Sequence, residues 1–195
     1  DYSAASKCYE SAGNKERALW SSATAAKDDP QTWELHANIC KKENKISHAK
    51  ESYKKAISCY EKHEDYEAAG VIGEQIAKFY QNLEENYHMH DYFGRCILNY
   101  ERAGKKEEAI RILRKANSLA KDPERKAKYL DSESKNSFEL GIQDSYKISE
   151  RAALEWNNAN RVEKQISSLE ESISQQSQLK SDGYNSRKKL IDVLK

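Results

Sequence analysis

The stretch NYERAGKKEEA, residues Asn99–Ala109, recurs in related form along the chain and decides the fold. Two other copies are CYESAGNKERA at Cys8–Ala18 and CYEKHEDYEAA at Cys59–Ala69, and a weaker copy, ICKKENKISHA, ends at Ala49. The final alanines of the copies recur at intervals that correspond to one helix or to a pair of helices. Because solenoids repeat one helix pair at an interval of about 34–45 residues, the spacing predicts a helical-repeat protein.

Each copy is predicted to form the turn of an antiparallel helix hairpin. Tyr100 lies on the inner face of a helix that Gly104 ends, because Gly tolerates the left-handed backbone common at helix C-termini. Two glutamates then suit the first turn of the next helix, and Ala109 begins its apolar stripe. The residues that we expect to form the packing framework of the repeats are Tyr9, Ala18, Tyr60, Ala69, Tyr100, Gly104 and Ala109.

Composition favours an all-α protein. The 195 residues include 7 Gly and 2 Pro, which are too few to end many short strands. A mean hydropathy of −1.01 with 37% hydrophobic residues suits thin layers of amphipathic helix. We expect one continuous α-solenoid over residues 1–195, a fragment of a longer chain, with atypical capping helices over residues 160–195.

The C-terminal quarter has a different apolar pattern. Val162, Ile166, Leu169 and Ile173 follow the alternating four- and three-residue spacing of a coiled-coil seam. The seam covers under two heptads, so we favour a last helix that packs on its neighbour with a polar outer face.

Charge and cysteine usage exclude several classes of protein. The 33 Lys and Arg nearly cancel the 32 Asp and Glu, which argues against a nucleic-acid-binding domain. The chain contains no long apolar run, so we expect neither a membrane span nor a signal peptide. The four cysteines lack the paired spacing of zinc or redox sites, so we expect free thiols, no metal, and a cytoplasmic protein.

Catalytic chemistry is not indicated, so we expect no enzyme and no cofactor. Nucleophile-elbow, dinucleotide, Walker, zincin and EF-hand motifs do not occur. The segment HMHD, His88–Asp91, could hold a metal if it formed a loop, but we favour a helix start there. The dispersed His36, His48 and His63 are interpreted as packing residues.

Basic residues cluster at the turns between helices. Lys41, Lys42 and Lys45 occupy one turn, and Lys105 and Lys106 occupy another. We interpret most such charges as a solvated face. The alternative is that these five lysines share one edge of the solenoid and bind an acidic partner.

The repeats resemble those of the soluble NSF attachment proteins, the SNAP family, and share much with tetratricopeptide-like repeats in general. The segment AISCYEKHEDYEAAGVIGEQIAKFY, Ala56–Tyr80, carries the match, with weaker support from the quoted stretch and from His90–Tyr100. The resemblance covers residues 1–120. The residues that match the family pattern are Tyr60, Glu61, Tyr66, Ala68, Ala69, Ile76, Ala77 and Tyr80.

This resemblance implies a right-handed superhelix and a function. A SNAP-like adaptor would wrap an acidic SNARE helix bundle through a basic face and recruit the NSF ATPase, an AAA ATPase, through its C-terminal end. It would act in SNARE disassembly and vesicular trafficking, in the cytoplasm and peripherally at membranes through its partners. The alternative is a general scaffold subunit of a coat, ciliary or other multiprotein complex.

Overall fold

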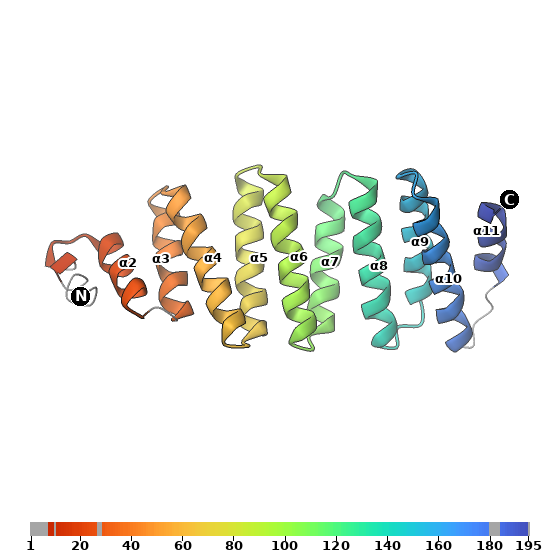
Figure 1. The fold of residues 1–195 in the computed structure, drawn as a ribbon, viewed down its shortest axis with the longest axis horizontal. Coiled ribbons are helices and arrows are strands. Elements are labelled where there is room, and N and C mark those ends of the chain that lie inside the picture. Colours follow the sequence, from red (N-terminus) through yellow and green to blue (C-terminus); the bar gives the residue numbers. More distant parts are fainter. Residues whose placement is uncertain (1–7, 10, 27–28, 180–183, 195) are drawn as a thin grey trace. The chain divides into compact units, whose positions relative to one another are not determined.

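Within each of two compact units, consecutive helices pack against one another in this computed structural model (Figure 1). The structure describes residues 8–9, 11–26, 29–179 and 184–194, in which all regular structure is α-helical and no strand occurs. The chain consists of two compact units: unit 1 is Asp1–Ala103 and unit 2 is Gly104–Lys195. The helices of unit 1 are α2 (Lys15–Ala26), α3 (Pro30–Lys42), α4 (Ile46–Lys62), α5 (Tyr66–Asn82) and α6 (Asn86–Arg102). Those of unit 2 are α7 (Lys106–Leu119), α8 (Pro123–Glu139), α9 (Ser145–Asn158), α10 (Val162–Gln178) and α11 (Tyr184–Leu194).

A constant interval relates the helices at the centre of the chain. Helices α4, α5 and α6 each have 17 residues. They begin at Ile46, Tyr66 and Asn86, so that each helix and its short turn occupy the same length of chain. The number of residues from the start of one helix to the start of the next equals the sequence separation of Ala49 and Ala69. A pair of helices spans twice that number of residues, as the repeats predict. The all-α fold class and the antiparallel hairpins of an α-solenoid are confirmed. The single continuous array and the right-handed superhelix stay predictions.

The turns of unit 1 share one backbone geometry. Asn44, Glu64 and Glu84 have φ values of 60°, 59° and 58°, in the left-handed region. The next residue in each turn donates its N–H to the carbonyl five positions earlier, with N···O distances of 2.8, 3.0 and 3.0 Å. This is the Schellman arrangement, in which a left-handed residue ends one helix and turns the chain into the next. Gly104, with φ 71°, has the same conformation.

Small residues let the helices of unit 1 approach closely. Ala49 and Ala69 have 0% of their surface exposed. Gly73 on α5 faces α6, where an added Cβ would lie 3.1 Å from the Cβ and 3.2 Å from the Cα of Cys96. Large side chains such as Tyr80 and Phe93 fill the adjacent space. Contact between the two helix backbones thus depends on the absence of a side chain at residue 73.

The buried side of α10 is polar, which differs from the predicted seam. Val162 is 51% exposed, and the buried residues of α10 are Gln165, Ser168, Leu169, Ser172, Gln175 and Gln176. Gln175 donates to Ser134 Oγ of α8 at 3.0 Å, and Ser134 also bonds Ser149 Oγ of α9 at 2.6 Å. Hydrogen bonds among the three helices thus allow Ser and Gln to be buried. The exposed side of α10 is also polar and includes Glu163, Lys164, Ser167, Glu170 and Glu171.

No helix among the described residues is both long enough and apolar enough to cross a membrane.

We expect Gly73→Ala to lower the free energy of unfolding by about 1 kcal/mol. Overpacking a helix contact costs about 1–3 kcal/mol, and Ala in a helix returns less than about 1 kcal/mol relative to Gly. The matched control is Gly94→Ala on α6, where nothing lies within 4 Å of the added Cβ, and it should stabilise by about 0.5–1 kcal/mol. Urea denaturation measures both, and equal stabilisation by the two variants would contradict the close approach.

Candidate functional site

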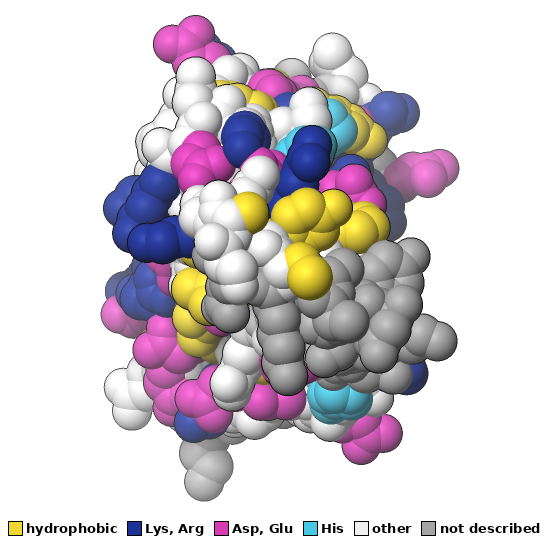
Figure 2. All heavy atoms as spheres, turned by 90° about the vertical axis from the view of Figure 1, so that its left-hand side faces the viewer, with side chains coloured by type: hydrophobic (Ala, Val, Ile, Leu, Met, Phe, Trp, Pro, Cys, Tyr) yellow, Lys and Arg dark blue, Asp and Glu magenta, His cyan; other side chains and the backbone are white. Residues whose placement is uncertain are grey.

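A pocket of about 570 Å³ lies among α2, α3 and α4 of unit 1. Figure 2 shows the molecule from this N-terminal side, where hydrophobic side chains lie among basic and acidic ones. The residues that line the pocket are Tyr9, Glu16, Arg17, Trp20, Ser21, His36, Lys45, His48, Glu51, Ser52 and Lys55. Its wall thus combines aromatic rings, imidazoles, carboxylates and ammonium groups.

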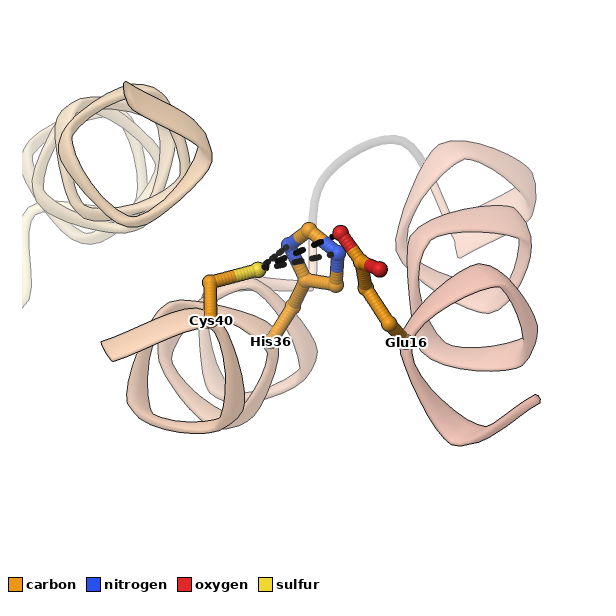
Figure 3. A group of neighbouring side chains, drawn as sticks. All are labelled: Glu16, His36 and Cys40. Carbon is orange, nitrogen blue, oxygen red and sulfur yellow. Dashed lines mark hydrogen bonds between the residues drawn. The ribbon is translucent and has the colours of Figure 1, made fainter. Parts of the chain in front are cut away.

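Three side chains with metal-binding atoms meet at the base of this pocket (Figure 3). His36 and Cys40 lie at positions i and i+4 of α3, so that their side chains share one face of the helix. Glu16 reaches them from α2. The Cys40 Sγ lies 3.6 Å from His36 Nε2 and 4.0 Å from Glu16 Oε1. One atom from each of these residues lies within 4.8 Å of the other two, so the group could hold a metal ion.

Hydrogen bonds from neighbouring residues fix the three side chains. His36 Nδ1 lies 2.7 Å from Ser52 Oγ of α4. The Glu16 Oε2 atom pairs with the Lys45 ammonium group, while Oε1 lies 3.0 Å from His48 Nδ1. The Cys40 Sγ lies 3.6 Å from His36 Nε2 and 3.9 Å from Nδ1, so the sulfur is nearly equidistant from the two ring nitrogens.

Burial and neighbouring charges set the protonation of the group. Burial lowers the pKa of His36, so its imidazole is neutral at pH 7. Burial and the nearby Glu16 carboxylate raise the pKa of the Cys40 thiol to about 11. Burial raises the pKa of Glu16, but hydrogen bonds from Lys45 and His48 outweigh it, so the net pKa lies below the ordinary value. At neutral pH the group thus consists of imidazole, thiol and carboxylate.

The structure places the five predicted partner-binding lysines in different settings. Lys45 pairs with Glu16 and with Glu43, whose carboxylate lies 2.8 Å away. Lys106 pairs with Glu139 at 2.6 Å.

Lys41, Lys42 and Lys105 are all exposed. The Lys41 ammonium lies 5.7 Å from the Phe79 ring centroid. Within the described residues, Lys41 and Lys42 take part in no ion pair.

That these five lysines share one edge stays a prediction. Within unit 1, Lys50, near the start of α4, pairs with Glu85 at 2.6 Å, which places the α3–α4 and α5–α6 turns at the same edge. Lys41, Lys42 and Lys45 lie at this edge of unit 1, whereas Lys105 and Lys106 belong to unit 2.

The segment HMHD forms no loop. It lies in the first turns of α6, with the His88 ring 5.1 Å from Tyr80 and the His90 side chain buried near Phe93. His63 is the C-cap residue of α4. Neither His88 nor His90 belongs to the group that could hold a metal.

Sequence reasoning missed Glu16, His36 and Cys40 as a group. The available signal was the i, i+4 spacing of His36 and Cys40, which resembles the spacing of metal ligands on one helix face. The spacing of cysteines alone carried no such signal, and all four cysteines are free in the structure. Glu16 comes from another helix, so only the packing of α2 on α3 reveals it.

Comparison with protein-family models found no match, and comparison with curated proteins found none either. Among solved structures, the chain is similar to BtubC from P. vanneervenii, with a TM-score of 0.44, 13% identity, and coverage of 83% of this chain and 70% of BtubC. It is also similar to YrrB, described as a TPR protein with an unusual peptide-binding site. That similarity has a TM-score of 0.29 and 15% identity over 88% of this chain and 98% of YrrB. Membership of the SNAP family stays a prediction.

We expect Glu16→Gln to remove stability that is present at pH 7 and absent in acid. The pKa of Glu16 is lower in the folded chain than its ordinary 4.5, so the ionised carboxylate stabilises the fold above that pH. The contribution is lost as the pH falls through the folded-state pKa. Urea denaturation from pH 7 to pH 3, with a chelator present, should show the wild type and variant converging in acid.

The control is Glu51→Gln, which changes an exposed carboxylate of the same pocket that pairs with Lys55 at 3.1 Å. At pH 7 it should lower the free energy of unfolding less than Glu16→Gln does, because exposed ion pairs contribute little to stability. A difference between wild type and Glu16→Gln that stays constant from pH 7 to pH 3 would contradict the assignment.

Proposed function

We propose that this chain is a non-enzymatic helical-repeat adaptor that binds an acidic protein surface through exposed lysines. The observation that carries the proposal is the exposure of Lys41 and Lys42 at the end of α3, where neither is held in an ion pair with another described residue. Lysines of this kind give up no internal ion pair on binding, and their charge attracts an acidic partner over about a Debye length. Lys45 and Lys106 would first have to leave Glu16 and Glu139.

The partner that we propose for this surface is an acidic SNARE helix bundle. The resemblance of Ala56–Tyr80 to SNAP repeats supports this choice, and a bundle of helices presents long rows of carboxylates. The same resemblance assigns recruitment of an AAA ATPase to the C-terminal end, in unit 2. Lys41 and Lys42 of unit 1 would act as one contact, and Lys105 and Lys106 of unit 2 as another.

A scaffold subunit of a coat, ciliary or other multiprotein complex is the second candidate. Large exposed apolar side chains in unit 1 favour it: Trp20 is 43% exposed, Leu98 55% and Tyr87 72%. Such side chains bind partners through apolar contacts, which respond little to salt. Salt dependence therefore separates the two candidates.

We expect Lys41→Glu combined with Lys42→Glu to weaken binding of a SNARE bundle by about tenfold or more at low salt, mainly by slowing association. The matched control is Lys54→Glu combined with Lys78→Glu, which makes the same change of charge at exposed positions of α4 and α5. Surface plasmon resonance at low and at physiological ionic strength measures both rates.

A second comparison is Lys105→Glu, in unit 2. It should weaken binding less than the Lys41 and Lys42 pair does, because it reverses one charge instead of two. Absence of binding at low salt would contradict the adaptor proposal, as would an equal loss in the Lys54 and Lys78 control. Binding that persists unchanged at high salt would instead support the scaffold candidate.

A further inference from the structure

We propose that Glu16, His36 and Cys40 bind one zinc ion, which ties α2 to α3. The three residues offer a carboxylate oxygen, an imidazole nitrogen and a thiolate sulfur, which are the ligand types that zinc prefers in proteins. His36 and Cys40 are buried, at 1% and 0% exposure, while Glu16 is half-buried at the base of the pocket.

The distances between the ligand atoms suit a tetrahedral zinc ion. Bonds of about 2.3 Å to sulfur and 2.0–2.1 Å to nitrogen or oxygen put neighbouring ligand atoms about 3.3–3.6 Å apart. The distance from Cys40 Sγ to His36 Nε2 is 3.6 Å, and that from Cys40 Sγ to Glu16 Oε1 is 4.0 Å. Because Cys40 Sγ also lies 3.9 Å from His36 Nδ1, a zinc ion bound to Nε2 requires the His36 ring to turn and the Cys40 and Glu16 side chains to move closer together.

Neighbouring residues already orient the ligands. Metal-binding histidines donate their second ring N–H to a fixed acceptor, which sets the tautomer and the ring direction. Ser52 Oγ, 2.7 Å from His36 Nδ1, is such an acceptor, and it leaves Nε2 for the metal. Lys45 pairs with Glu16 Oε2, whereas Oε1 lies 3.0 Å from His48 Nδ1 and 4.0 Å from Cys40 Sγ. Glu16 would therefore bind the metal through Oε1 while that oxygen also contacts His48.

The pocket supplies access and a fourth ligand position. It is lined by Glu16 and His36 and provides room for water on the side away from the α3 core. The three protein ligands plus one water complete a four-coordinate ion. His48, exposed on α4 and 3.0 Å from Glu16 Oε1, borders this position.

Binding of zinc is coupled to the release of one proton. A thiol binds zinc as the thiolate, so the S–H proton of Cys40 passes to solvent as the zinc–sulfur bond forms. Zinc binding should therefore weaken as the pH falls.

A hydrogen-bonded cluster that only packs α2 on α3 is the competing account. In it the Cys40 thiol donates weak hydrogen bonds to His36 and Glu16, and no metal is needed. The experiment must therefore detect the metal itself as well as the stability of the fold.

The experiment is a titration of the chelator-treated full chain with Co²⁺ and then Zn²⁺. We expect one Co²⁺ per chain, with the intense visible bands of a tetrahedral site and a near-ultraviolet thiolate-to-cobalt band, both lost when zinc displaces cobalt. Calorimetry in buffers of different ionisation enthalpy should show one proton released per zinc at neutral pH. Saturating zinc should also raise the thermal midpoint of unfolding.

Matched variants locate the site. Cys40→Ser should weaken zinc binding by about 100-fold or more and abolish the thiolate band and the released proton, whereas Cys59→Ser, at another buried cysteine, should change none of these. Glu16→Gln, at a half-buried position, should cost about 100-fold, and Ser52→Ala about tenfold because it removes only the orienting hydrogen bond. Circular dichroism checks that each variant folds.

The proposal is overturned if the folded wild type takes up neither cobalt nor zinc at millimolar metal and pH 8. It is equally overturned if Cys40→Ser and Glu16→Gln bind zinc as the wild type does. A folded protein with a zinc-independent thermal midpoint would support the competing hydrogen-bonded cluster.

Discussion

A left-handed residue at the ends of α3, α4 and α5 is the constraint on which the arrangement of unit 1 depends. At Asn44, Glu64 and Glu84 it reverses the chain within a short turn, so that each helix packs against the one before it. The closing N–H···O bond satisfies a carbonyl that the helix end would otherwise leave without a partner. Because this turn recurs at a constant interval, α4, α5 and α6 have equal lengths. Residues at the same position of successive repeats therefore have similar surroundings. Ala49 and Ala69, each fully buried, are one result.

The same constraint places the turns of unit 1 at two edges. Every turn reverses the chain, so the α3–α4 and α5–α6 turns share an edge, where Lys50 pairs with Glu85. Lys41, Lys42 and Lys45 lie at this edge, because they occupy the α3–α4 turn. Lys105 and Lys106 belong to unit 2, and their alignment with the other three lysines stays a prediction.

Local patterns were predictable and contacts between helices were not. The helix end at Gly104 and the apolar stripe after Ala109 depend on residues within one turn of each other. Both can therefore be predicted directly from the sequence. The buried polar side of α10 depends on hydrogen bonds from Ser134 and Ser149, on two other helices. The proposed metal-binding group combines a local pattern with a contact between helices. The spacing of His36 and Cys40 can be recognised in the sequence. Glu16 is far from Cys40 in the sequence and comes close to it only because α2 packs on α3.

The proposed zinc site and the proposed partner-binding surface interact through charge. Zinc brings two positive charges and displaces one proton from Cys40, so binding adds one net positive charge immediately before Lys41 and Lys42 in the chain. Lys45 would keep its carboxylate partner, because it pairs with Glu16 Oε2 and the metal takes Oε1. An acidic partner at this edge would meet a more positive and more rigid surface when zinc is bound. Salt screens such an effect beyond about 8–10 Å, so the added attraction would be confined to contacts near the end of α3.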